Sequence, residues 1–161
     1  SRRTVSDWST PSRRHLHRGY YLPTNKGSSL GEVAIAIDTS CSVTKEQFQH
    51  MIAEINRIMV KLKPEKLLII HCDDAIAKVT TYKPRDFPIK ETTMYGRGYT
   101  EFKPVFDYLE KEKIKPTCLI YFTDMWGDFD FPKPRYPVLW INTDYPNNQK
   151  PTFGKVIGLN I

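Results

Sequence analysis

The segment DTSCS at residues 38–42 places a carboxylate and two hydroxyl groups at alternate positions. In an extended segment residues i, i+2 and i+4 point to the same side, so Asp38, Ser40 and Ser42 can present their oxygen atoms together. The apolar run VAIAI at residues 33–37 ends directly before Asp38. The carboxylate therefore follows a strand that we expect to be buried, and its position suggests a binding site.

Two more oxygen-bearing residues stand at comparable places farther along the chain. Thr100 ends the glycine-containing loop GRGYT ahead of an expected helix, and Asp124 ends the apolar run of LIYFTD. A set of two carboxylates and three neutral hydroxyls suits a hard cation, Mg²⁺ or Mn²⁺, bound at about 2.1 Å with several waters retained. The hydroxyls leave the ion incompletely neutralised. We therefore expect an external anionic oxygen to complete its coordination, and we expect the isolated domain to bind the ion weakly.

Apolar strands and amphipathic helices alternate along the chain, which predicts an α/β fold with a mostly parallel, doubly wound sheet flanked by helices. The expected strands lie at residues 33–37, 66–72, 75–82, 117–123, 136–142 and 154–161, and the expected helices at 44–63 and 101–113. The more alternating strand 75–82 should lie at an edge. Ligands bind such sheets beyond the carboxyl ends of the strands, where strand order reverses. If the first strand is central, the three polar loops converge there.

Composition and cysteine content indicate an ordinary folded domain. The chain has 161 residues, of which 40% are apolar and 12% aromatic, and no apolar run approaches the roughly 20 residues of a membrane span. Its three cysteines form no disulfide framework, and Cys72 and Cys118 lie in apolar runs typical of buried free thiols. We expect a cytoplasmic protein. Because the sequence begins with serine, we also expect it to be part of a longer protein.

The positive charge is concentrated at the beginning of the chain. Residues 1–30 contain six basic side chains and one acidic one, whereas residues 31–161 are nearly neutral. We interpret residues 1–30 as a basic arm and residues 31–161 as the domain proper. The arm either packs on the domain through its aromatic residues or contacts an acidic partner or the phosphates of a nucleic acid.

The motifs resemble those of von Willebrand factor A-like (VWA-like) domains. DTSCS is similar to their Asp-x-Ser-x-Ser signature, and their metal-ion-dependent adhesion site (MIDAS) also takes a threonine from a glycine-rich loop and an aspartate from a strand ending in Thr-Asp. Carried over residue by residue, the resemblance assigns the metal to the following residues: Asp38, Ser40, Ser42, Thr100 and Asp124. Cys41 and Tyr99 stand where the family often has glycine.

The resemblance extends over most of the chain. YTEFKPVFDYL, YFTDMWGDF and YPVLWI resemble a bacterial VWA-like domain that follows a predicted zinc-metallopeptidase region. The resemblance implies a Rossmann-like VWA fold over residues 31–161, and it implies AAA+ ATPases of the MoxR type as partners. The His-Glu-x-x-His motif of the peptidase half does not occur in this sequence.

Several other residues leave alternatives open. Asp73 and Asp74, after the second strand, either form a turn or support the metal site from outside the ligand set. Trp126, Phe129 and Phe131 either fold back onto the core or form an exposed rim beside the ion. The four histidines show no metal-ligand spacing, and we interpret them as structural or surface residues: His15, His17, His50 and His71.

Two classes of function fit these features. The first is a non-enzymatic interaction module whose metal ion binds an Asp or Glu of a partner, with Arg97, Tyr99 and Trp126 as the surrounding contact surface. The second is a Mg²⁺-dependent phosphatase or nuclease. Haloacid-dehalogenase-type phosphatases have Asp-x-Asp where this chain has Ser40, and no nucleophile–base pair is evident. We therefore predict the first class and no enzymatic activity.

Overall fold

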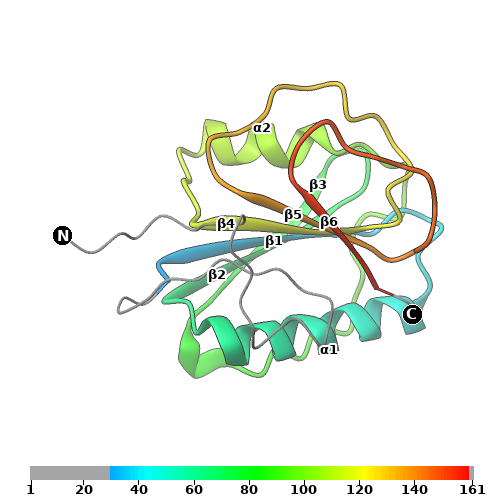
Figure 1. Cartoon of the computed structure of the whole chain (residues 1–161). Helices are drawn as coiled ribbons and strands as arrows, with labels where there is room; N and C mark the ends of the chain where they lie inside the picture. The colour runs from blue at the N-terminus through cyan, green and yellow to red at the C-terminus, as the bar shows by residue number, and fades with distance from the viewer. Residues whose placement is uncertain (1–29, 160–161) are drawn as a thin grey trace.

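The computed structural model describes residues 30–159, which form a six-stranded sheet with α-helices on both faces (Figure 1). The strands are β1 (Glu32–Asp38), β2 (Lys66–Cys72), β3 (Ile76–Tyr82), β4 (Cys118–Thr123), β5 (Val138–Asn142) and β6 (Lys155–Gly158). The helices are α1 (Lys45–Leu62), the short 3-10 helix η2 (Pro84–Asp86) and α2 (Lys103–Lys111). The strand order is β3-β2-β1-β4-β5-β6. The edge strand β3 is antiparallel to β2, and the remaining pairs are parallel.

β1 is central because both of its faces and both of its edges are covered. It pairs in parallel with β2 and with β4, and a strand buried on both faces is apolar throughout. Its side chains alternate between two cores. The α1-side core includes Val33, Ile35, Ile37, Phe48, Met51, Ile55, Ile69 and Ile120. The α2-side core includes Ala34, Ala36, Ile70, Phe102, Phe106, Tyr121 and Trp140.

The beginning of α1 is fixed by a capping box. The Thr44 hydroxyl accepts a hydrogen bond from the Gln47 N–H (3.1 Å), and the Gln47 side chain accepts one from the Thr44 N–H (2.9 Å). These bonds satisfy backbone donors that the first helical turn leaves free. The helix ends where Lys63 takes a left-handed conformation (φ 48°), directly before Pro64.

The predicted fold is confirmed: the sheet is mostly parallel and doubly wound, and residues 76–82 form its antiparallel edge. α2 is shorter than the predicted helix 101–113 and retains Pro104 in its first turn, where the missing N–H costs no hydrogen bond. Residues 1–29, which make up nearly all of the expected basic arm, lie outside the described part. Within residues 30–159 no helix combines the length and apolar character needed to cross a membrane.

The two packed faces predict a large difference between core and surface substitutions. Ile120→Ala in β4 removes a fully buried side chain and should lower the free energy of unfolding by about 2–5 kcal/mol. Val60→Ala on α1, where the side chain is 68% exposed, should change it by less than about 0.5 kcal/mol. Urea unfolding followed by circular dichroism measures both. Equal effects would contradict the central position of β4.

Candidate functional site

The carboxyl ends of β1 and β4 form the switch point of the sheet. From β1 the chain continues to β2 on one side, and from β4 it continues to β5 on the other, so the strand order reverses between them. Asp38 is the last residue of β1, and Thr123 is the last residue of β4. The Thr123 hydroxyl donates a hydrogen bond to Asp38 Oδ2 (2.8 Å). The predicted motif therefore lies where doubly wound sheets bind ligands.

Ser40, Ser42 and Asp124 extend this contact into a group of oxygen atoms. The Ser40 N–H donates to Asp38 Oδ1 (2.9 Å), and the Ser40 and Ser42 hydroxyl oxygens lie 3.2 Å apart. The Ser42 hydroxyl in turn donates to Asp124 Oδ2 (3.4 Å). Four of the five residues predicted as metal ligands are thus joined by hydrogen bonds across the switch point.

Thr100, the fifth predicted ligand, lies on a loop that crosses the edge of the sheet. Met94 packs on the α1-side core and Phe102 in the α2-side core, so the residues between them pass over the strand ends. The loop is bonded to the motif where the Cys41 N–H donates to the Gly98 carbonyl (3.0 Å). Within residues 30–159 the Thr100 hydroxyl makes no hydrogen bond to the other four residues.

Asp73, directly after β2, holds the same loop. Its carboxylate accepts hydrogen bonds from the N–H groups of Gly98 (2.9 Å) and Ala75 (3.0 Å), and its carbonyl accepts one from the Glu101 N–H (3.0 Å). Burial raises the pKa of Asp73, but hydrogen bonds to its carboxylate, chiefly from the Ala75 and Gly98 N–H groups, outweigh burial and lower the pKa overall. Asp73 thus forms a turn and also fixes the backbone on both sides of Thr100.

Two glycines allow this close approach. A Cβ atom at Gly98 would lie 2.8 Å from Asp73 Oδ2, and one at Gly96 would lie 2.9 Å from the Thr39 hydroxyl oxygen. Gly96 also has a φ of 113°, which residues with side chains rarely adopt. The glycines of GRGYT are therefore needed for contact with Thr39 and Asp73.

The three residues predicted to contact a partner are placed differently from one another. The Arg97 guanidinium donates to the backbone carbonyls of Ser40 (3.0 Å) and Cys41 (3.4 Å), so it bridges the loop and the motif. Tyr99 is 81% exposed and Trp126 is 53% exposed. The indole N–H of Trp126 donates to Asp144 Oδ2 (3.1 Å). Both aromatic side chains are available at the surface, and one hydrogen bond orients Trp126.

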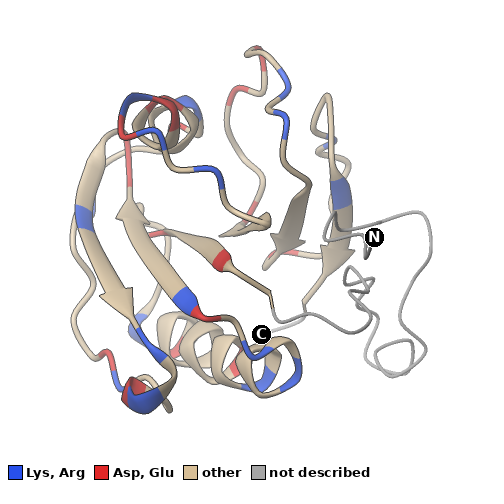
Figure 2. Cartoon of the chain, turned by 90° about the vertical axis from the view of Figure 1, so that its left-hand side faces the viewer, with Lys and Arg blue, Asp and Glu red and all other residues tan. Residues whose placement is uncertain are grey.

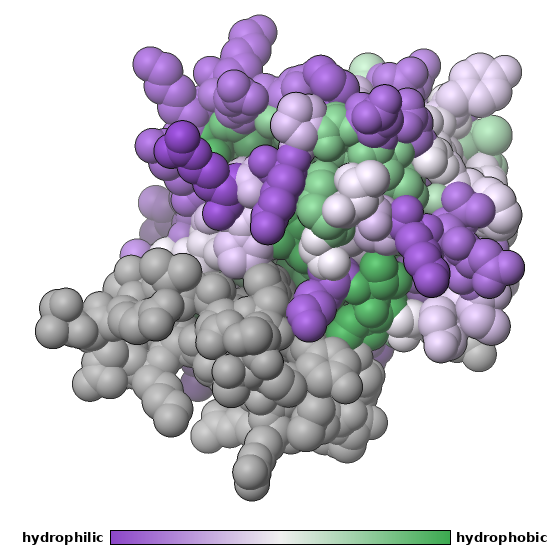
Figure 3. All heavy atoms as spheres, turned by 45° about the horizontal axis from the view of Figure 1, so that its top comes forward, coloured by the Kyte–Doolittle hydropathy of each residue, from purple (hydrophilic) through white to green (hydrophobic). Residues whose placement is uncertain are grey.

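The surface of the described part combines both signs of charge with apolar areas. Basic and acidic residues are interspersed over the helices and loops (Figure 2), in keeping with the near-neutral composition beyond residue 30. Seen from above α2, apolar side chains reach the surface between hydrophilic ones (Figure 3). This distribution resembles an ordinary protein surface with local apolar areas rather than a strongly basic one.

The Asp38 carboxylate is buried, with 1% of the residue exposed. Burial raises its pKa, and hydrogen bonds from Ser40 and Thr123 offset part of that rise. Among the described residues, no Lys, Arg or His forms an ion pair with Asp38 or Asp124. A buried carboxylate without a cationic neighbour favours a bound cation or a proton. The residues present therefore fit a hard divalent cation held by oxygen atoms.

The carboxylate count at the site is low. Within residues 30–159 no three His, Cys, Asp or Glu side chains come together in a group that could hold a metal by themselves. The group at the switch point has two carboxylates, Asp38 and Asp124, and depends on hydroxyls for its other oxygen atoms. This composition suits Mg²⁺, which retains several waters and needs few protein ligands.

Thr39 and Thr123 were not singled out by the sequence analysis. Thr123 had a usable signal, because its alternation with Leu119 and Tyr121 places it on the same face of the sheet as Asp38. Thr39 had none. Its hydroxyl donates to the carbonyl of Tyr95 (2.5 Å), with the Cys72 carbonyl 3.1 Å away, and both contacts depend on distant segments.

The aromatic residues after Asp124 divide between core and surface. Phe129 stacks on Phe102 with ring centroids 4.7 Å apart, and Phe131 contacts Phe106 at 4.9 Å, so both fold back onto the α2-side core. Trp126 remains exposed. Of the histidines, His71 is buried and His50 exposed, and His15 and His17 lie outside the described residues.

Comparison with known proteins identifies a family for this chain. A family model described as a VWA-like domain (DUF2201) matches residues 33–160. No curated protein and no solved structure matches the chain significantly. The match begins in β1 and covers every strand and both α-helices.

The contacts of Asp73 predict a specific effect of its removal. Asp73→Ala should speed hydrogen exchange at the Gly98 amide, because that N–H loses its acceptor, and should cost about 1–2 kcal/mol in the free energy of unfolding. Asp107→Ala, which breaks only the surface pair with Lys103, is the matched control and should leave Gly98 exchange unchanged. NMR-detected exchange measures this. Gly98 protection that survives Asp73→Ala would refute the role given to Asp73.

The raised pKa of Asp38 predicts a pH-dependent gain in stability for Asp38→Asn in metal-free buffer. Because the folded state disfavours the charged form, wild type loses stability relative to the variant as the pH rises above the ordinary carboxyl pKa of about 3.9. At pH 7 the variant should be more stable by on the order of 1 kcal/mol, and the difference should vanish below about pH 3.9. Urea unfolding in EDTA across this range is the measurement. If the free energy of unfolding of wild type instead rose relative to that of Asp38→Asn with increasing pH, burial would not be the main influence on the Asp38 pKa.

Proposed function

The chain belongs to the VWA-like domain family (DUF2201), and we propose that it is a protein-interaction module whose switch-point residues hold Mg²⁺ or Mn²⁺ and capture a carboxylate of a partner. Family membership supports an interaction or adhesion-type module in general. The observation that carries the finer proposal is the hydrogen-bonded group of Asp38, Ser40, Ser42 and Asp124 around a buried carboxylate.

The proposed ligands are Asp38, Ser40, Ser42, Thr100 and Asp124. When bound, the metal would supply an electrophilic centre for an anionic oxygen. The chain's own residues prepare the site: Thr123 and the Ser40 N–H orient the Asp38 carboxylate, and Asp73 fixes the backbone beside Thr100. Since two carboxylates only balance a divalent charge, a third carboxylate from a partner meets less repulsion than at a carboxylate-rich calcium site.

A single metal–carboxylate contact does not offset the free energy lost on association. The exposed aromatic residues Tyr99 and Trp126 supply further contact area of the kind enriched at interface hot spots. Arg97 already bonds two backbone carbonyls of the motif, and we assign it the additional role of contacting the partner with its remaining donors. An AAA+ ATPase of the MoxR type is the first partner to test.

We favour a non-enzymatic role because two of the three cysteines are buried, and the thiol of the exposed one, Cys41, makes no hydrogen bond to a base among the described residues. Cys72 and Cys118 are buried, and burial raises the pKa of Cys118 to about 12 and that of Cys72 further still. Both therefore remain neutral thiols near pH 7. Of the two histidines in the described part, His50 is exposed, and the buried His71 contacts Glu91 and Tyr95 rather than a switch-point residue.

Titration calorimetry with Mn²⁺ tests the metal site. Wild type should bind Mn²⁺ weakly, and Asp38→Ala and Thr100→Ala should each weaken binding at least about tenfold. Thr93→Ala changes an exposed threonine in the preceding loop segment and should bind as wild type does. Equal Mn²⁺ heats for wild type and Asp38→Ala would overturn the metal proposal.

The capture step is tested in a binding assay with a MoxR-type AAA+ ATPase. EDTA and Thr100→Ala should each weaken the complex, and their effects should not add, because both disable the same element. Trp126→Ala should weaken it by about 2 kcal/mol. A complex that survives EDTA and Asp124→Ala, yet disappears when residues 1–29 are removed, would assign recognition to the N-terminal arm instead.

A further inference from the structure

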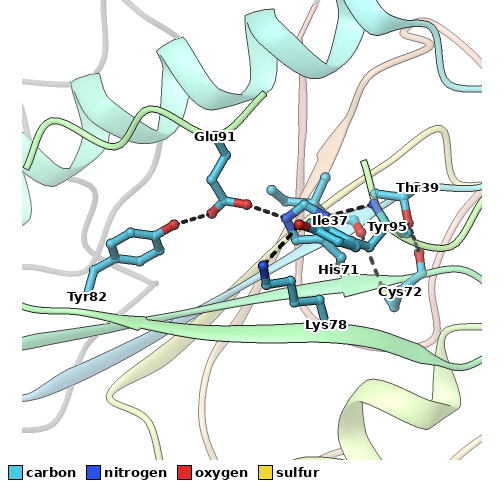
Figure 4. Close-up of polar contacts among 8 residues, drawn as sticks. All are labelled: Ile37, Thr39, His71, Cys72, Lys78, Tyr82, Glu91 and Tyr95. Carbon is cyan, nitrogen blue, oxygen red and sulfur yellow. Dashed lines mark hydrogen bonds and ion pairs between the residues drawn. The ribbon is translucent and has the colours of Figure 1, made fainter. Parts of the chain in front are cut away.

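A partly buried hydrogen-bond network on the α1 side of the sheet joins β3, β2 and the loop that carries Thr100 (Figure 4). The Tyr82 hydroxyl donates to Glu91 Oε2 (2.7 Å), and Glu91 Oε1 lies 2.5 Å from His71 Nε2. The His71 side chain is fully buried. Neither His71 nor Glu91 belongs to the proposed ligand set. Metal coordination therefore does not explain why this hydrogen-bond network is present.

The contacts define the tautomer of His71. The backbone N–H of Tyr95 points at His71 Nδ1 over 3.4 Å, so Nδ1 must be the acceptor. Nε2 then carries the hydrogen and donates to Glu91. Burial raises the pKa of Glu91, but hydrogen bonds from His71 and Tyr82 lower it overall, so Glu91 is an ionised acceptor. The donor and acceptor roles of the Tyr82 hydroxyl, the Glu91 carboxylate, the His71 ring and the Tyr95 N–H are thus mutually compatible.

The hydrogen-bond network ends at the backbone of Tyr95, whose N–H and carbonyl groups are both hydrogen-bonded. His71 binds the Tyr95 N–H, and the Thr39 hydroxyl donates to the Tyr95 carbonyl (2.5 Å). The rings of His71 and Tyr95 also meet edge to face at 5.4 Å. On the outer side, the ammonium group of Lys78 lies 3.1 Å from the Tyr95 hydroxyl and 4.2 Å from its ring centre.

The segment before Tyr95 is anchored as well. The Asn56 side chain on α1 donates to the Ile89 carbonyl (2.9 Å) and accepts from the Ile89 N–H (2.8 Å). The segment is thus fixed at residue 89 by α1 and at residues 91 and 95 by His71. The loop begins its crossing of the sheet edge directly after this last contact.

We propose that His71 is a positioning residue for the metal site: by accepting from the Tyr95 N–H it sets where the loop 95–100 begins, and so where Thr100 stands relative to the DTSCS motif. Its effect on metal binding rests on the proposed function, whereas its effect on the loop does not. Second contacts of this kind commonly change metal affinity by about 10–100-fold when removed.

Two substitutions separate positioning from mere packing. Asparagine places its side-chain oxygen near the position of Nδ1, so His71→Asn retains an acceptor for the Tyr95 N–H. His71→Leu fills similar volume without an acceptor. In metal-free protein, His71→Leu should speed hydrogen exchange at the Arg97 and Gly98 amides, and it should weaken Mn²⁺ binding about tenfold. His71→Asn should stay close to wild type in both.

The outcomes distinguish this proposal from the proposed function. A folded His71→Leu protein with wild-type exchange at Arg97 and Gly98 would overturn the positioning role. Exchange that changes as expected in a protein that binds no Mn²⁺ would support the positioning role and refute the metal site. If His71→Leu does not fold, ¹⁵N NMR of the wild-type imidazole decides: a hydrogen on Nε2 supports the proposal, and a hydrogen on Nδ1 overturns it.

Discussion

The hydrogen bond from the Thr123 hydroxyl to the Asp38 carboxylate joins the two strands between which the order of the sheet reverses. Parallel pairing brings the carboxyl ends of β1 and β4 to the same edge, and the connections then leave in opposite directions. Asp38 lies buried at that edge. The buried carboxylate, the serines after it and the loop ending at Thr100 all take their positions from this junction.

Burying the Asp38 carboxylate is costly unless hydrogen bonds or a cation compensate. Its partners are the Thr123 hydroxyl and the backbone N–H and side chain of Ser40, all neutral, and its pKa is raised. By contrast, Asp73 and Glu91 accept enough hydrogen bonds to lower their pKa values. The protein thus keeps the two supporting carboxylates ionised, whereas the charge of Asp38 is only partly compensated, which fits the proposed cation site.

The two faces of the sheet contribute differently to this edge. On the α1 side, polar contacts of Thr39 and His71 hold the loop at Tyr95. On the α2 side the support is aromatic: Phe102 stacks on Phe129, and a Cβ atom at Gly127 would lie 2.6 Å from the Phe102 ring. The segment after Asp124 is therefore packed directly onto the core, which keeps the exposed Trp126 close to the site.

The sequence by itself determined the elements and their order. Runs such as VAIAI, the Thr44–Gln47 capping box and the turn residues act through neighbours in the chain, so period and composition revealed the strands, α1 and the mostly parallel sheet. The length of α2 was overestimated by two residues at each end, because terminal residues of a helix can instead form turns. DTSCS and Asp124 were recognisable by residue type and by position after strands, and Thr100 by its place at the end of a glycine-containing loop.

Only the tertiary structure decided which groups meet. Thr123 and Asp38 are 85 residues apart, and Thr39 and Tyr95 are 56 apart, so no local pattern relates them. Asp73 looked like a turn residue and His71 like an ordinary core histidine, because their partners lie on a loop whose path depends on both packed faces. Hydrogen-bond partners follow from strand order and register, which arise from burying two faces at once rather than from the preferences of adjacent residues.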